Sequence, residues 1–366
     1  MDAADRINYL NIGLMIVAAI AAFVLPFEIF LFSYAVLGPL HYLTEISWLH
    51  EKRYFTKHRF DYVLLSLVAL AIFILAFGTE WLFRHLPALF PGFASLEAVK
   101  GSSSGWITGL AFISFASALA MTTLKRSLYR LFAFVFILIT AQFIKDSQSA
   151  LIVFAVFLPT LVHVFLFTGA FVLYGALKTR SRSGILSFVV FLLCPALIWL
   201  LNDYGLGRPI GEYVQQSYRM FETLNQKTID LLHLGSSQHQ ADIYYSSYGV
   251  LVMRVIAYAY TYHYLNWFSK TNVIRWHEIS RRRIAAIALL WLAAVGTYAY
   301  NYRTGIIALY CLSLLHVFLE FPLNHVTFLG IGREVVRWRR GRTTIAPATA
   351  VATAGGGAAP LLSKES

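Results

Sequence analysis

Four histidines lie inside apolar stretches of this chain that are long enough to cross a membrane. They are His41, His163, His263 and His316. An ionisable side chain in a membrane interior usually marks a functional site, and neutral imidazole is the commonest protein ligand for transition metals. A single buried histidine can also simply bond to a backbone carbonyl. Four histidines in similar surroundings nevertheless predict a shared metal site.

Two of these histidines are followed by a glutamate four residues later, as His41–Glu45 and His316–Glu320. Residues i and i+4 share one face of an α-helix, so each pair points the same way. Inward-facing histidine and glutamate side chains build metal sites in helix bundles. A carboxylate in this place either ligates the metal or holds a neighbouring imidazole in the right tautomer. We therefore predict Glu45 and Glu320 as further ligands or as catalytic groups beside the metal.

Two more histidines, His50 and His325, lie nine residues beyond His41 and His316. Nine residues span about 13.5 Å of helix. We therefore expect both to miss the site, unless Pro322 breaks the last helix.

Polar residues around His263 are weaker candidates. Tyr262 and Asn266 can hydrogen-bond a ligand or the metal site, and Tyr262 is our third candidate for a catalytic residue. Both can equally bond to a neighbouring helix. Arg254, earlier in the same stretch, either forms a structural ion pair or contacts the substrate.

The elements that must position these residues are membrane helices. The 366 residues are 58% hydrophobic and 13% charged, whereas about a quarter of an ordinary soluble domain is charged. The predicted fold class is all-α, a polytopic transmembrane helix bundle. Its ten predicted spans are residues 8–25, 28–49, 61–83, 105–123, 127–144, 149–177, 184–201, 247–268, 284–301 and 305–325.

The basic residues favour one orientation of these spans. The net charge of +12 comes from Lys and Arg in short loops, which the positive-inside rule explains better than binding to nucleic acid. Both termini are then cytoplasmic, and every even-numbered span runs inward. The four histidines lie in spans two, six, eight and ten, near the middle or in the inner half. They can therefore meet at one depth.

Three segments make up the predicted domain organisation. Residues 1–330 form the bundle, within which 202–246 is an amphipathic outer connection that lies on the membrane or caps a cavity as a lid. Residues 331–366 form a basic and then disordered cytoplasmic tail. The two cysteines, Cys194 and Cys311, lie in apolar spans, which speaks against a disulfide framework.

Four short motifs resemble those of the bacterial Brp/Blh family of β-carotene dioxygenases. "GPLHYLTE" is similar to the family's first Pro-His-Gly-x-x-Asp motif, and "LLHVFLEF" to its last His-x-x-x-x-Asp motif. "PTLVHVFLF" and "YTYHYLNWF" fall where the second and third histidine motifs belong. Both acids are Glu here, and only one histidine occupies the third motif. The resemblance implies a membrane helix bundle with histidine-bound iron.

The leading hypothesis is a non-haem iron oxygenase or oxidoreductase in the bacterial inner membrane. It would act on a lipophilic substrate such as a carotenoid, an isoprenoid or an acyl lipid. Two alternatives stay open, because paired histidines also bind haem in electron-transfer proteins and intramembrane His and Glu residues also build proton relays in transporters. The expected partners are the substrate, membrane lipid and an electron donor that the sequence does not identify. No nucleic acid is expected.

Overall fold

The computed structural model describes residues 3–78, 103–235, 237, 239–270 and 279–339. All regular structure in these ranges is helical, and no strand occurs in them. This agrees with the predicted all-α class, since a helix satisfies its backbone groups internally in lipid. The longest elements are α1 (Ala3–Val24), α4 (Asp61–Phe73), α7 (Ser103–Thr123), α8 (Ser127–Ile144), α11 (Arg182–Leu200), α15 (Ser247–Ser269), α17 (Arg281–Tyr300) and α18 (Tyr302–Arg339).

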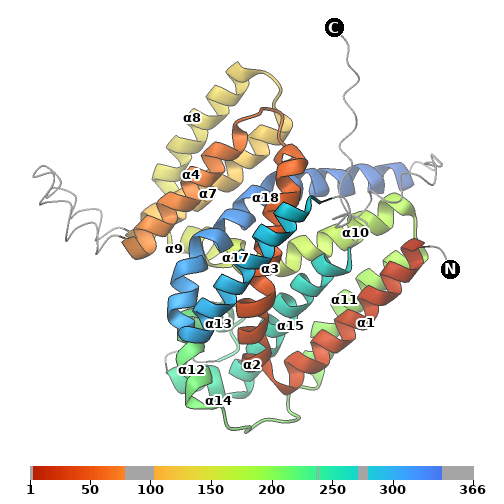
Figure 1. Ribbon diagram of the computed structural model, residues 1–366, viewed down its shortest axis with the longest axis vertical. Coiled ribbons are helices and arrows are strands. Elements are labelled where there is room, and N and C mark those ends of the chain that lie inside the picture. The colour runs from red at the N-terminus through yellow and green to blue at the C-terminus, as the bar shows by residue number, and fades with distance from the viewer. Residues whose placement is uncertain (1–2, 79–102, 236, 238, 271–278, 340–366) are drawn as a thin grey trace, which may run out of the picture. The chain divides into compact units, whose positions relative to one another are not determined.

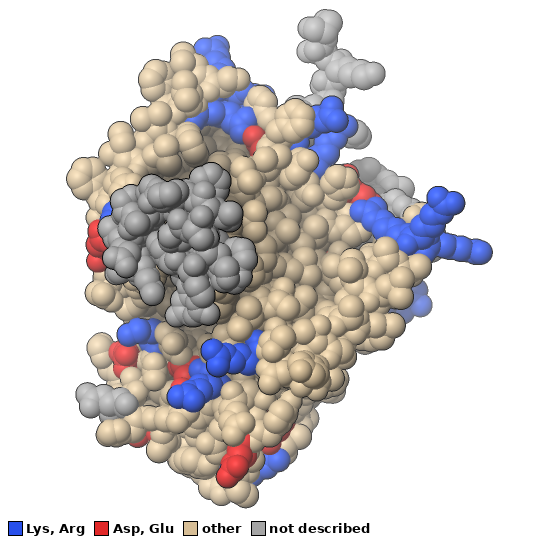
Figure 2. All heavy atoms as spheres, turned by 60° about the vertical axis from the view of Figure 1, so that its left-hand side comes forward, with Lys and Arg blue, Asp and Glu red and all other residues tan. Residues whose placement is uncertain are grey.

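Long apolar helices mark the protein as membrane-spanning. Nine helical segments within the described residues are long and apolar enough to cross a bilayer. The predicted eighth span, α15, is not among the nine, because its tyrosines and residues such as Arg254 lower its hydropathy. On the face drawn in Figure 2, charged side chains form separate groups, and a broad area between them carries none.

The chain forms two compact units, each built from distant segments. The first unit contains Met1–Thr44, Leu161–Gly305 and Val326–Ser366, and the second contains Glu45–Thr160 and Ile306–His325. The divisions fall inside continuous helical elements, so α18 contributes to both units.

In the first unit, α15 is the central helix (Figure 1). Of its 23 residues, 16 are buried. Polar side chains on a helix covered on all sides must find their partners within the protein. The helices that pack against α15 are α1, α11, α2 (Pro26–Phe32), α13 (Glu222–Leu231) and α14 (Gln240–Tyr245).

The connection predicted at 202–246 is helical and fastened to the first unit. It contains α12 (Glu212–Tyr218), η6 (Arg219–Phe221), α13 and α14. Asn202 Nδ2 donates to the Ser247 carbonyl over 2.9 Å, and Arg208 pairs with Glu28 at 3.1 Å. These contacts fasten the start of the connection to the first residue of α15 and to α2.

One irregular helical segment precedes His41, and another contains His163. The π-helix η1 (Ser33–Leu37) leads into α3 (Gly38–Glu51), and the π-helix η5 (Leu151–Phe167) leads into α10 (Thr168–Thr179). Within η5, Thr160 leaves helical geometry (φ −119°, ψ −105°) directly after Pro159, which cannot donate a backbone hydrogen bond. Such π segments frequently occur at functional sites.

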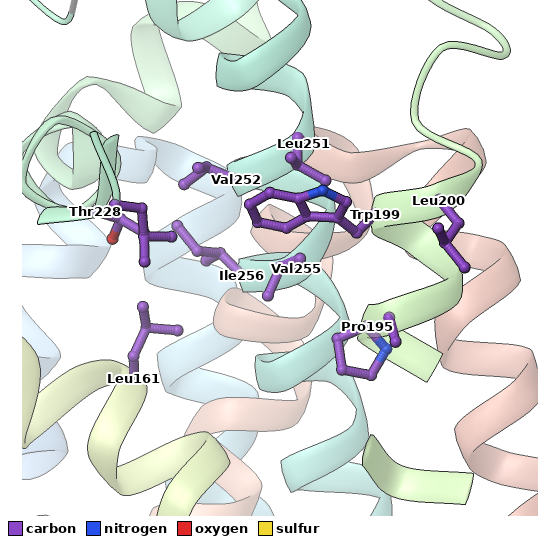
Figure 3. A pocket seen from close by; sticks show the side chains of 11 residues that line it. Leu161, Pro195, Trp199, Leu200, Thr228, Leu251, Val252, Val255 and Ile256 are labelled. Atoms are coloured by element: carbon purple, nitrogen blue, oxygen red, sulfur yellow. The ribbon is translucent and has the colours of Figure 1, made fainter. Parts of the chain in front are cut away.

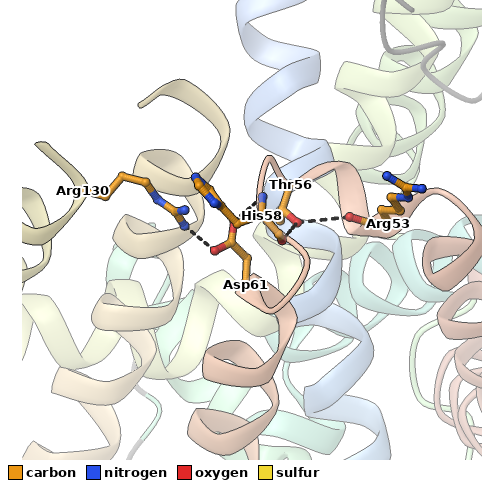
Figure 4. A network of polar contacts seen from close by, with 5 residues as sticks. All are labelled: Arg53, Thr56, His58, Asp61 and Arg130. Carbon is orange, nitrogen blue, oxygen red and sulfur yellow. Dashed lines mark hydrogen bonds and ion pairs between the residues drawn. The ribbon is translucent and has the colours of Figure 1, made fainter. Parts of the chain in front are cut away.

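In the second unit, α7 packs against α4 and α8. At the start of α4, Asp61 pairs with Arg130 and accepts a hydrogen bond from the His58 backbone N–H at 3.3 Å (Figure 4). Thr56 Oγ1 donates to the Arg53 carbonyl at 3.1 Å in the same turn (Figure 4). This network holds the loop between α3 and α4.

The last described helix extends past residue 330, where we predicted the boundary between bundle and tail. Helix α18 continues through that position to Arg339. The predicted disordered part of the tail, from Thr343 onward, lies outside the described residues, and so does the end of the third predicted span, residues 79–83.

Candidate metal centre

Three histidines of the first unit converge in its interior. His41 on α3, His163 in η5 and His263 on α15 are 1%, 2% and 6% exposed. The Nε2 atoms of His41 and His263 lie 3.0 Å apart. The ring of His263 lies 4.7 Å from that of His41 and 4.8 Å from that of His163, at angles of 80° and 65°. The rings therefore meet edge to face, and Nε2 of His41 faces Nε2 of His263.

His316 on α18 completes the group. One ring nitrogen from each of His41, His163, His263 and His316 lies within 4.8 Å of the others, and all four residues are buried. Histidine binds metal at about 2.0–2.1 Å, so two ligands of one ion lie at most about 4.2 Å apart and about 3.4 Å apart in a tetrahedral site. The group could hold a metal ion, and four imidazoles suit iron, copper, nickel or zinc.

Thr168 fixes the orientation of His263, and the sequence analysis missed it. Its Oγ1 lies 2.8 Å from His263 Nδ1, and its side chain is buried at the start of α10. When Nδ1 donates its proton to this hydroxyl, Nε2 is the nitrogen left to accept a metal. Thr168 lies five residues after His163. In an α-helix, residues five apart do not share a face, but in the π-helical winding of η5 they do.

Aromatic side chains enclose the histidines of the first unit. The rings of Tyr264 and Trp267 lie 5.3 Å and 5.5 Å from His41. The hydroxyls of Tyr42 and Tyr264 share a hydrogen bond of 3.0 Å. Gly38 leaves room for this pair, since a Cβ there would lie 3.0 Å from the Tyr42 hydroxyl. The surroundings therefore exclude bulk water from the ring nitrogens.

Glu45 and Glu320 are both buried, each 2% exposed. They lie one turn beyond His41 and His316 on α3 and α18. The metal-ligand group found in the described residues consists of histidines and does not include either carboxylate. Their predicted parts as ligands or catalytic groups therefore stay predictions.

The Tyr262 hydroxyl contacts two amide oxygens, Asn11 Oδ1 at 3.3 Å and Asn266 Oδ1 at 3.5 Å. Asn11 also accepts from Ser269 at 3.1 Å. The two bonds to Asn11 join α15 to α1, which is the structural alternative considered for Tyr262, whereas the Tyr262–Asn266 contact lies within α15. A catalytic part for Tyr262 remains a prediction.

The two outlying histidines are not members of the group. His50 Nδ1 lies 3.2 Å from the Tyr54 hydroxyl. His325 Nε2 lies 3.0 Å from the Phe115 carbonyl, the ordinary arrangement of a buried histidine. Helix α18 continues through Pro322, so no break brings His325 back towards His316.

No protein-family model, no curated protein and no solved structure matches this chain.

Proposed function

We propose that this protein is a membrane-embedded enzyme that binds non-haem iron through His41, His163, His263 and His316 and oxidises a lipophilic substrate. The observation that carries the proposal is the buried four-histidine group. Imidazole ligands suit iron, and a protein site with open coordination positions lets the metal bind and activate oxygen. The motifs that resemble Brp/Blh proteins favour iron over other metals and a carotenoid, isoprenoid or acyl lipid as substrate.

The placement of the group agrees with this chemistry. The histidines are carried by helices whose surroundings are apolar and aromatic. Such a site admits a lipophilic molecule and excludes the water that would quench reactive species. Glu45, Glu320 and Tyr262 are proposed to hold or move protons near the metal. We further propose ten spans with both termini in the cytoplasm of a bacterial cell and the protein in its inner membrane.

The haem alternative fits the spacing less well. The axial nitrogens of a bis-histidine haem lie about 4 Å apart on opposite faces of the porphyrin. The Nε2 atoms of His41 and His263 are only 3.0 Å apart. The ligand atoms of His163 and His316 lie within 4.8 Å of both, and their imidazoles would occupy the space that a porphyrin between His41 and His263 needs. This favours a single ion.

Metal analysis of the purified protein tests the proposal. We expect stoichiometric iron, no Soret band, and loss of the metal in His41→Ala, whereas His50→Ala retains it because His50 bonds to Tyr54 instead. Metal-free wild-type protein that transports a solute in liposomes would establish the transporter alternative. A Soret band that disappears in His41→Ala would establish haem.

A further inference from the structure

The first unit contains an apolar cavity of about 520 Å³, within the size range of small-molecule sites. Its walls come from α11, α15, the segment around α13, and Leu161 of η5 (Figure 3). Trp199 extends from α11 towards Leu251 and Val255 of α15 (Figure 3). The predicted lid segment contributes Thr228 and Leu232.

The chemistry of the walls restricts the occupant. No charged side chain lines the cavity. Its one hydroxyl, Thr228 Oγ1, is already bonded to the Leu224 carbonyl at 2.7 Å. Apart from the indole N–H of Trp199, the walls offer a polar ligand group no hydrogen-bond partner in exchange for its hydration. A hydrocarbon chain loses nothing and gains burial at about 0.8 kcal/mol per methylene.

The rim of the cavity is exposed and belongs to a membrane span. Trp199 and Leu200, at the end of α11, are 50% and 76% exposed, and α11 is one of the candidate spans. Leu232 on the opposite side is 49% exposed. A chain can therefore enter from the bilayer without passing through water.

The inner part of the cavity lies on the two elements that carry His163 and His263. Leu161 stands two residues before His163 in η5. On α15, Val252 and Ile256 share a helix face with His263, at separations of eleven and seven residues. Seven residues correspond to about 10.5 Å along the axis. Ala259 lies between Ile256 and His263 on that face, and its side chain is a single methyl group, which occupies little space.

We propose that this cavity binds the hydrocarbon chain of the lipid substrate, with the polar end at the rim and the apolar end directed along α15 towards His263. This inference rests on the proposed function, because it gives that metal centre its substrate site. The cavity then selects substrates mainly by chain length and shape, since its walls are almost entirely apolar and carry no charge.

Spin-labelled stearic acid provides a direct test. The probe carries its nitroxide either near the carboxyl group or near the methyl end, and it is added to purified protein loaded with paramagnetic Co²⁺. We expect the metal to accelerate relaxation of the methyl-end label more than that of the carboxyl-end label. Equal acceleration of both labels, or none in a sample whose metal content is stoichiometric, would overturn the proposed direction of the chain.

Filling variants test the cavity itself. Val255→Phe places a larger ring in the wall, and Leu232→Trp does so from an exposed position outside the helical core. Each should weaken probe binding about tenfold, the loss expected when about two methylene groups no longer fit. The control Leu193→Phe, on an exposed part of α11 outside the lining, should bind as wild type does.

The two proposals fail in different ways. Undiminished binding in both filling variants would refute the cavity as the site even if the metal is present. Absence of metal in a protein whose binding follows the filling variants would refute the proposed metalloenzyme and leave a lipid-binding cavity.

Discussion

Arg254 and His263 are both buried on α15, nine residues or about 13.5 Å apart, yet their surroundings differ in kind. The Arg254 guanidinium stacks on the Phe23 ring at 3.8 Å. It donates to the carbonyls of Phe23, Asn202 and Tyr204 at 3.0, 2.8 and 2.9 Å, and to Asn202 Oδ1 at 3.1 Å. His263 instead has one nitrogen against Thr168 and the other against a second imidazole.

The contrast separates a structural polar residue from a candidate functional one. Arg254 joins α15 to the end of α1 and the start of the outer connection, and fixed backbone acceptors satisfy it. At His263, Nε2 faces the Nε2 of His41 at 3.0 Å, and this pair can be joined either by an N–H···N hydrogen bond between neutral rings or by a metal ion that both nitrogens ligate. Burial alone does not distinguish the two residues, whereas the type of partner does.

Metal removal should have the largest effect. A chelator should destabilise the wild-type protein by about 4 kcal/mol if the metal had been present at about a thousand times its Kd, because the ion binds only the folded state. His263→Ala should unfold identically with and without chelator. Thermal unfolding in detergent measures both. If His263→Ala responds to the chelator as wild type does, the metal sits elsewhere.

Arg254→Met should cost about 3 kcal/mol of folding free energy, since it leaves several buried carbonyls without their donor. The folded fraction should keep its metal and its response to chelator. The exposed Arg303 on α18 supplies the control, and Arg303→Met should change stability by less than about 0.5 kcal/mol. Loss of metal in Arg254→Met would show that Arg254 supports the metal site and would contradict its purely structural role.

Thr168→Val should weaken metal binding about 10–100-fold while the four histidines remain in place, because it removes the hydroxyl that orients His263. Thr168→Ser keeps the hydroxyl and should restore binding, as competition with a calibrated chelator would measure. Equal affinities for Val and Ser variants would show that the hydroxyl does not orient the ring.

The helical fold was predictable from sequence because membrane spans are long and only helices satisfy their backbone groups in lipid. The predicted spans at 127–144 and 184–201 match α8 and α11 closely. Helix α18 continues to Arg339, so the basic residues that follow the predicted tenth span, 305–325, lie on its last turns. Polarity signals the end of the apolar stretch and does not by itself end a helix.

The histidine group was predictable because imidazole is rare in apolar spans. Thr168 was not, because its place beside His263 depends on the π-helical winding of η5 and on packing between distant segments. The partners of Arg254 were also hidden, because all but Asn202 Oδ1 are backbone carbonyls, which have no side-chain signature. Sequence thus points to ligands more readily than to the groups that orient them.

Tyr264→Phe should have the smallest effect and tests where the metal site ends. It removes the hydrogen bond to Tyr42, which lies beside His41, and should cost about 1 kcal/mol. Tyr42→Phe should cost a similar amount, and the double variant should cost less than the sum, because both single changes remove the same bond. Metal content should stay at the wild-type level in all three, since no ring nitrogen changes. If Tyr264→Phe alone released the metal, the Tyr42–Tyr264 pair would be part of the metal site. A polar group on α15 could then be functional even though its hydrogen bonds are satisfied within the protein.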